Sequence, residues 1–218
     1  MTVGPTAVGY SVVLPPAWRK IPVRGGTEKA IRKIVDQAFA ALPKNVPRDK
    51  VTPYRIELTR QLTDAARRAR QQGGTELYLP VELEHGALIA ASFVVSEGSV
   101  PAPDDDLDPA RVLAALAAKP GGRSVVVGGV LAVRSERVAP PDPHSEIDFG
   151  SRRVDYVFPV PGDERRWLLV AFSALGAGDP EDKFAGLLVE LFDAIMSTFR
   201  WAGDDGRNEE RAPDSGTG

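Results

Sequence analysis

The apolar residues of this chain follow two different periods, and the change from one to the other predicts the order of its elements. Near the start, Gly9–Leu14 is rich in β-branched and aromatic residues and is followed by two prolines, which predicts a strand. Residues 28–42 then repeat apolar side chains every three or four positions, as one face of a helix does. A second helix is predicted from Thr52, as the N-cap, and Pro53 to the glycines at 73–74.

From residue 76 onward the period changes to two, which indicates strands. Residues 76–84 and 87–96 predict a hairpin, in which Pro80 makes the first strand an edge or bulged strand. Two further pairs of strands are predicted within residues 124–138 and 152–174, each pair joined at a glycine-containing turn. The middle of the chain therefore predicts an antiparallel sheet.

The last element is the most regular helix of the sequence. Asp179 is the expected N-cap and Pro180 the first helical residue. Its predicted buried face consists of residues at helical spacing: Phe184, Leu187, Leu188, Leu191, Ile195 and Phe199. Residues 203–218 follow, carry a net charge of −3 and contain no large apolar residue, so we expect a disordered acidic tail.

Together these elements predict an α+β fold, an antiparallel β-sheet flanked by helices. The apolar content of 43% is sufficient for one core, so residues 1–202 are expected to form a single domain. Residues 27–74 are then a two-helix insertion after the first strand, and such insertions often carry function on a common scaffold.

Composition narrows the function classes. The chain has no cysteine, which excludes disulfides, thiolate zinc sites and a cysteine nucleophile and fits a reducing compartment. Its formal net charge is only −3, so no overall positive field attracts nucleic acid or anionic membranes. No apolar run approaches the ~20 residues that span a bilayer. We therefore expect a cytoplasmic protein that binds neither nucleic acid nor membrane.

No residue pattern identifies a catalytic, cofactor or metal site. His85 and His144 are the only histidines, and neither lies in a nucleophile or metal-ligand motif. The aspartates at 104–106 lack the glycine and distal glutamate of a calcium loop, so an exposed acidic loop is the simpler interpretation. An enzyme that uses carboxylates as acid and base stays open as an alternative.

Basic side chains gather in the second predicted helix. From Arg48 to Arg70 there are seven Lys or Arg residues against three Asp or Glu residues, a local charge of +4. The candidates for contact with an acidic protein partner are Arg55, Arg60, Arg67 and Arg70. The alternative is that these arginines are solvated, because cations near a helix C-terminus are also favoured by the helix dipole.

Three segments resemble the PsbP-like α/β/α sandwich superfamily, in particular its actinobacterial LpqN-like branch. They are the start YSVVLPPAW at 10–18, the central GGVLAV at 128–133 and the terminal helix FDAIMSTF at 192–199. The resemblance implies a sandwich fold and binding of proteins or small ligands, since few members are enzymes. Residues 27–72 depart from the family, in which a shorter connection is usual, and the shared motifs are structural.

The leading hypothesis is a non-enzymatic binding or adaptor protein, bacterial in origin, that contacts a protein partner and needs no cofactor. The carboxylate enzyme is one alternative. An accessory component of a secretion or cell-surface assembly is another, and it rests only on the family resemblance. The sequence does not indicate the partner, the biological process or the oligomeric state.

Overall fold

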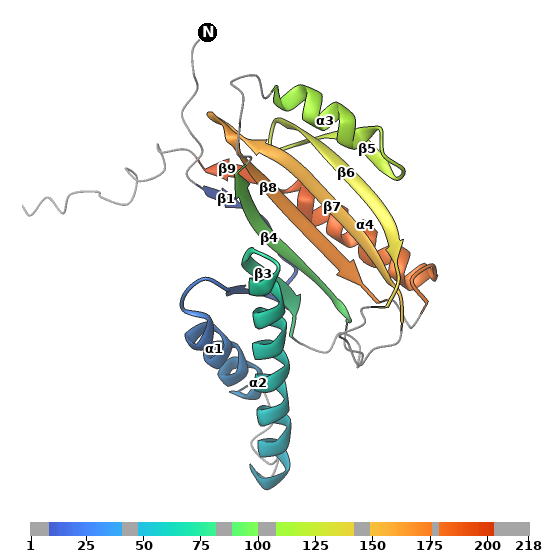
Figure 1. Ribbon diagram of the computed structural model, residues 1–218. Coiled ribbons are helices and arrows are strands. Elements are labelled where there is room, and N and C mark those ends of the chain that lie inside the picture. Colours follow the sequence, from blue (N-terminus) through green and yellow to red (C-terminus); the bar gives the residue numbers. More distant parts are fainter. Residues whose placement is uncertain are drawn as a thin grey trace, which may run out of the picture.

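The computed structural model describes six segments of the chain, residues 9–40, 48–81, 89–99, 108–141, 149–175 and 179–202 (Figure 1). Its elements are β1 (Gly9–Ser11), β2 (Trp18–Pro22), α1 (Thr27–Ala40), α2 (Arg48–Gln71), β3 (Gly74–Pro80), β4 (Ala91–Ser99), α3 (Pro109–Ala117), β5 (Gly122–Val127), β6 (Val130–Ala139), β7 (Ser151–Val160), β8 (Asp163–Ala174), α4 (Lys183–Ser197) and β9 (Arg200–Ala202).

Seven strands form one antiparallel sheet in the order β2-β3-β4-β8-β7-β6-β5. The predicted hairpins β3–β4, β5–β6 and β7–β8 all form. The short strands β1 and β9 pair separately, with Tyr10 opposite Trp201. The antiparallel sheet with flanking helices confirms the predicted α+β fold class.

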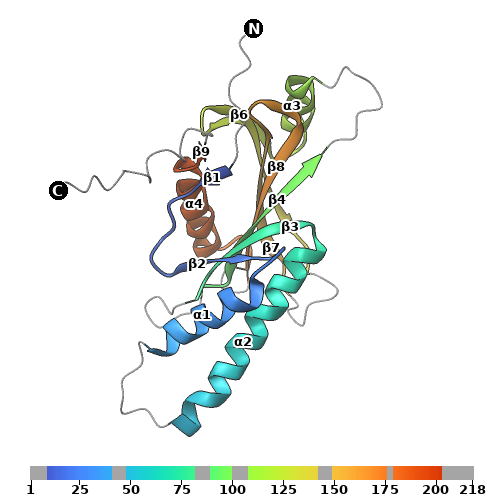
Figure 2. The ribbon, with the colours of Figure 1, turned by 90° about the vertical axis from the view of Figure 1, so that its left-hand side faces the viewer.

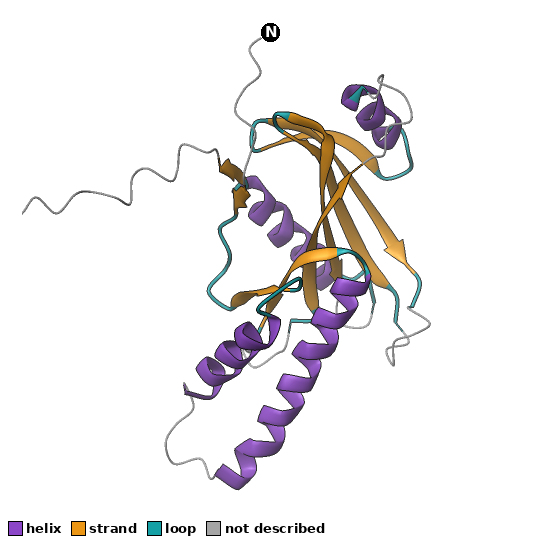
Figure 3. Ribbon diagram, turned by 60° about the vertical axis from the view of Figure 1, so that its left-hand side comes forward, coloured by secondary structure: helices purple, strands orange, loops and turns teal. Residues whose placement is uncertain are grey.

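The sheet lies between two layers of helices (Figures 2 and 3). On one face α4 packs on the main core, where Phe192 contacts the rings of Phe93, Phe172 and Tyr156. On the other face, two separate groups of helices cover different strands of the sheet. Helices α1 and α2 pack on β2 and β3, and α3 packs on Val133 and Trp167 of β6 and β8.

Local signals explain most element boundaries. The carboxylate of Asp108 accepts a hydrogen bond from the backbone N–H of Ala110 at 2.9 Å and caps the start of α3. Gly128 and Gly129 have φ values of 57° and 80°, which the tight turn between β5 and β6 requires. A Cβ at position 128 would also lie 3.0 Å from the ring of Phe199, so the turn tolerates only glycine there.

The N-terminal half differs from the prediction in two ways. The helices 27–74 follow the second strand, because residues 18–22 form β2, which the sequence pattern did not indicate. Helix α2 begins at Arg48 rather than at Thr52, so Pro53 lies inside it. A proline near a helix start removes one N–H group and costs less there than in the middle.

The terminal helix also differs in its start and in its buried face. It begins at Lys183, and the carboxylate of Asp182, not Asp179, caps it by accepting from Ala185 N–H. Its buried face is rotated toward Phe192, which is fully buried, whereas Leu187 is 60% exposed. Of the predicted stripe, Leu188, Ile195 and Phe199 are buried as expected, whereas Phe184 and Leu187 are exposed.

Some predictions concern residues outside the described segments. These are the acidic tail 203–218, both histidines and the aspartates at 104–106.

The packing of α4 generates a paired stability test. Phe192→Ala should lower the free energy of unfolding by about 3–5 kcal/mol, because it removes a ring from the centre of the core. Leu187→Ala, five residues earlier on the exposed side of α4, should change it by less than about 0.5 kcal/mol. Urea unfolding of both variants measures this, and equal losses would show that the buried face is assigned wrongly.

Candidate functional site

Helices α1 and α2 form an arm that extends away from the sheet, and we call this pair the helical arm (Figures 1 and 2). Only the part next to the sheet is packed. Ile31, Ile34 and Val35 of α1 contact Leu62 and Ala66 of α2 over the apolar face of β2 and β3. Burial of these side chains fixes the direction of the arm relative to the sheet.

The outer part of α2 has no such cover. No side chain between Thr52 and Glu57 is buried, and Tyr54 and Ile56 are 73% and 65% exposed. Tyr54 lies four residues before Leu58 and eight before Leu62, so it continues the packed stripe of α2 beyond the point where packing stops. Two apolar side chains, Tyr54 and Ile56, are therefore exposed near the outer end of the arm, and because they are two residues apart they point to different sides of α2.

The structure places all four predicted partner-binding arginines on the exposed surface of α2, but three of them have intramolecular ion pairs. Arg55 pairs with Asp36 of α1, and its guanidinium lies 5.9 Å from the centre of the Phe39 ring. Arg60 pairs with Glu57 and Asp64, at 2.7 and 3.3 Å.

Asp64 also accepts an ion pair from Arg67 at 3.0 Å. Arg70, in contrast, makes no ion pair or side-chain hydrogen bond with any described residue, and neither does its neighbour Arg68. Arg70 is therefore the predicted residue that has no ion pair among the described residues, whereas Arg55, Arg60 and Arg67 also pair within the arm.

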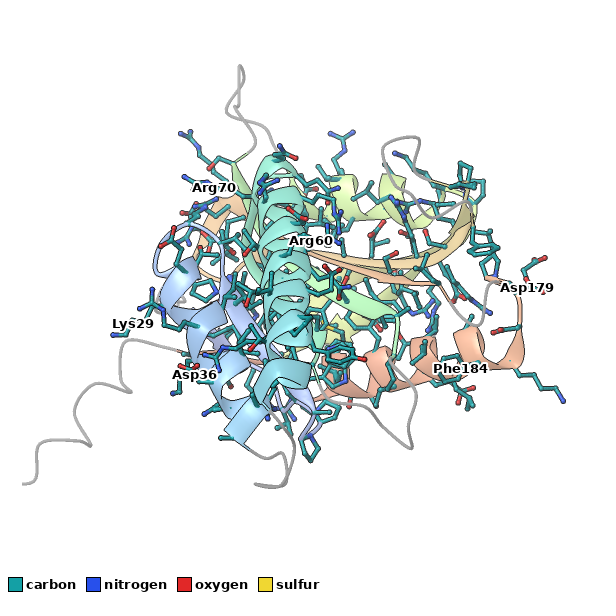
Figure 4. The ribbon with its side chains drawn as sticks, turned by 90° about the horizontal axis from the view of Figure 1, so that it is seen from below. Lys29, Asp36, Arg60, Arg70, Asp179 and Phe184 are labelled. Carbon is teal, nitrogen blue, oxygen red and sulfur yellow. The ribbon has the colours of Figure 1, made fainter. Side chains whose placement is uncertain are left out.

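A second set of exposed cations lies on α1, and the sequence interpretation missed it. Lys29, Arg32 and Lys33 form no ion pair within the described segments. They line a shallow hollow of about 580 Å³ along α1, together with Asp36, Gln37 and Ala40. Figure 4 shows Lys29 and Asp36 along α1 beside α2, which carries Arg60 and Arg70. Counting charge over both helices, not over α2 alone, would have found this set.

The charge of the arm is opposite to that of the remaining chain. Residues 27–74 contain eleven Lys or Arg and five Asp or Glu residues, a net charge of +6 in a chain of net charge −3. The rest of the chain therefore carries −9. Asp179 and Phe184 at the start of α4 lie at the far side of the molecule from Lys29 (Figure 4).

Glu76 of β3 is the centre of a polar cluster where the small and large sheets meet. Its carboxylate accepts hydrogen bonds from the hydroxyls of Tyr10 and Tyr78, the latter at 2.6 Å, and from Lys20 Nζ at 3.0 Å. Burial acts to raise the pKa of Glu76, but these three donors outweigh it and lower the pKa. Burial, followed by interactions with its neighbours, raises the pKa of Tyr10, so this cluster holds one carboxylate ionised beside neutral phenols.

A second polar cluster joins α4 to the sheet. Arg134 of β6 is only 5% exposed and donates two hydrogen bonds of 2.9 Å to the carboxylate of Asp193. Tyr156 donates to the same carboxylate at 2.7 Å. Arg134 also contacts Glu136 at 2.9 Å, and Glu136 in turn binds Arg152. Burial acts to lower the pKa of Arg134, but its hydrogen bonds with the two carboxylates raise it overall.

Neither Glu76 nor Glu136 has the raised pKa that suits a general acid. A general acid needs a carboxyl whose pKa is raised toward neutrality, but the pKa values of Glu76 and Glu136 are lowered by their donors despite burial. Among the described residues, no group of His, Cys, Asp and Glu side chains is arranged to hold a metal ion. What the two clusters do is connect elements that are distant in sequence.

No protein-family model matches the chain, and no curated protein is similar to it in sequence. In the segments described, no helix is both long and apolar enough to cross a bilayer. The helical arm, with its exposed apolar residues and free cations, is therefore the candidate site on structural grounds.

The buried ion pair generates a second paired test. Arg134→Ala should lower the free energy of unfolding by about 3 kcal/mol, because it leaves Asp193 partly buried with only Tyr156 as a donor. Arg137→Ala, three residues on, breaks an exposed pair with Asp155 and should cost less than about 1 kcal/mol. Thermal or denaturant unfolding compares the two, and similar losses would contradict the assigned role of Arg134.

The lowered pKa of Glu76 predicts the pH dependence of its contribution. A carboxyl whose pKa is lower in the folded than in the unfolded chain stabilises the fold above the unfolded value, 4.5 for Glu. That contribution is lost as the pH falls through the folded pKa. Glu76→Gln should therefore destabilise the protein at pH 7, and the difference from wild type should shrink below about pH 4.5.

Unfolding by urea at a series of pH values measures this difference. Tyr78→Phe, which removes one donor to Glu76, should give part of the same pattern. A difference between wild type and Glu76→Gln that stays constant down to acid pH would rule out the stabilising role of the ionised carboxylate.

Proposed function

We propose that this protein is a non-enzymatic binding or adaptor protein that contacts an acidic protein partner through its helical arm. The observation that carries the proposal is the unpacked outer part of α2, where Tyr54 and Ile56 are exposed on a helix that extends beyond its own core. The proposal also agrees with the resemblance of three sequence segments, at 10–18, 128–133 and 192–199, to the PsbP-like superfamily, whose members bind proteins or ligands.

Helix α2 is longer than its packing against the described part of the chain requires. Helix α2 has 24 residues, about 36 Å in length, yet among its residues whose burial is described, 52–71, the buried side chains lie between Leu62 and Ala69. Most helices in proteins are stabilised by packing of an apolar face. A partner that covers Tyr54 supplies that packing, and it extends a stripe already used at Leu58 and Leu62.

Charge determines the kind of partner. Residues 27–74 carry +6, and the cations of the arm that have no ion pair among the described residues, Lys29, Arg32, Lys33, Arg68 and Arg70, are exposed. Such charges increase the rate of association with an acidic surface, and their effect weakens with salt. Aromatic residues suited to stacking on bases are few, since Tyr54 is the only exposed aromatic among the described residues of the arm. An acidic protein therefore fits better than a nucleic acid.

The test uses two arm variants and one control. Tyr54→Ser/Ile56→Ser removes the apolar contacts, and Arg68→Glu/Arg70→Glu reverses two cations that have no intramolecular partner among the described residues. Val13→Ser/Leu187→Ser changes two apolar residues that are equally exposed but lie on the body. Reversal of Arg60 or Arg67 is less informative, because it also breaks ion pairs within α2.

Each protein is immobilised and used to retain proteins from native lysate at low and high salt, with quantification by mass spectrometry. Wild type and control should retain the same acidic proteins, and both arm variants should lose them at least tenfold. High salt should reduce retention by wild type. If the arm variants retain the same proteins as wild type, or wild type retains none, the proposal is wrong.

A further inference from the structure

The two edge strands of the large sheet differ in how their outward backbone groups are satisfied. Backbone bonds from Val23 N–H to Thr75 and from Val81 N–H to Ala17 show that odd-numbered residues of β2 face β3. The outward groups therefore belong to residues 18, 20 and 22.

Most of these outward groups of β2 are occupied or missing. The N–H of Trp18 donates to the carbonyl of Pro15 at 2.9 Å, and the carbonyl of Trp18 accepts from Arg19 at 3.0 Å. Pro22 has no N–H, and its carbonyl accepts from the Thr27 hydroxyl at 2.7 Å. Among the described residues of β2, only Lys20 has both backbone groups outward and without a described partner, and lysine at an edge opposes strand addition.

The opposite edge strand, β5, does not have its outward backbone groups protected in this way. The N–H of Glu136 donates to the carbonyl of Gly121 at 3.1 Å, so odd-numbered residues of β5 face β6 and Ser124 and Val126 point their backbone groups outward. Neither residue has a hydrogen-bond partner for these groups among the described residues. The strand has no proline and no bulge, and Arg123 is its only charge.

The side chains at this edge are also apolar and exposed. Val126 is 72% exposed, and Leu131, directly opposite it on β6, is 46% exposed. A regular edge strand with apolar side chains and open backbone groups is a site for addition of another strand.

We propose that a second copy of this chain pairs with β5 through its own β5, antiparallel, about a twofold axis at Val125. Ser124 then lies opposite Val126 of the partner subunit, and the symmetry repeats the pair. The four outward N–H groups and four outward carbonyls of the two copies form four hydrogen bonds. One continuous sheet then runs through both copies.

A second copy fits this edge because the strand is complementary to itself in this register. Arg123 lies opposite Val127 of the partner subunit, so no like charges face each other across the axis. An axis at Arg123 would place the two guanidinium groups side by side, at a cost. Since β2 is protected and β5 is not, each copy has one open edge, which gives a closed dimer and no filament. This dimer does not use the helical arm.

The chain contains no cysteine, so one introduced cysteine reports on the axis without background. At a non-hydrogen-bonded antiparallel pair the Cβ atoms are about 5 Å apart, close to the distance of a disulfide. Val125→Cys should therefore form a disulfide-linked dimer under mild oxidation. Leu131 is more exposed than Val125 but lies one strand away from the axis. The Leu131→Cys variant should therefore run as a monomer on a non-reducing gel.

Two measurements on the protein without cysteine complete the test. Wild type should sediment as a dimer, and Ser124→Pro, which removes an outward N–H and leaves the β5–β6 ladder intact, should sediment as a folded monomer with unchanged circular dichroism. The amide hydrogens of Ser124 and Val126 should exchange more slowly as wild-type concentration rises. A monomeric wild type, or crosslinking of Leu131→Cys as readily as Val125→Cys, would overturn the proposal.

Discussion

The packing of one aromatic ring, Phe192, determines how the layers of this protein are joined. Its ring stacks on Phe172 at 4.6 Å between centroids and also contacts Phe93 and Tyr156, which come from three adjacent strands. Because these strands are central in the sheet, α4 covers the middle of one face and leaves the outer strands to other elements. Arg134 and Asp193 then fix the rotation of the helix beside that ring, since their paired hydrogen bonds require a planar alignment.

The other face of the sheet is covered by separate helices as a result of this arrangement. Seven strands are too wide for one helix, so α3 packs near the β5 end and the helical arm near the β2 end. The arm is longer than the surface it covers, and only its inner part contributes to the core. The outer part of α2 therefore adds no buried side chain to this core within the described residues, and Tyr54 and Ile56 are exposed there.

The sheet could be predicted from the sequence because its strands alternate apolar and polar residues and because its turns contain glycine. The hairpins were indicated by alternation and by glycines with positive φ, and both are local properties. β2 and β9 were not predictable, because strands of five and three residues contain too few positions to show a period. They are held by distant partners instead.

The candidate site was predictable in part for the same reason. The arginines of α2 were visible as a charge cluster, but their pairing was not, because Arg55 finds Asp36 on another helix. The rotation of α4 depended on the Arg134–Asp193 pair, whose members are 59 residues apart. Contacts at such separations leave no trace in local periodicity.

The pairing of β1 with β9 has a consequence for the order in which this protein can fold. Gly9 lies opposite Ala202, so nearly the whole described chain is enclosed between two strands that meet each other. Tyr10 and Trp201 both pack against Phe199, which in turn contacts Phe158 of the sheet. During synthesis β1 has no partner strand until residues 200–202 have been made. Closure of such a long loop is entropically slow, so this end of the aromatic core forms late in folding.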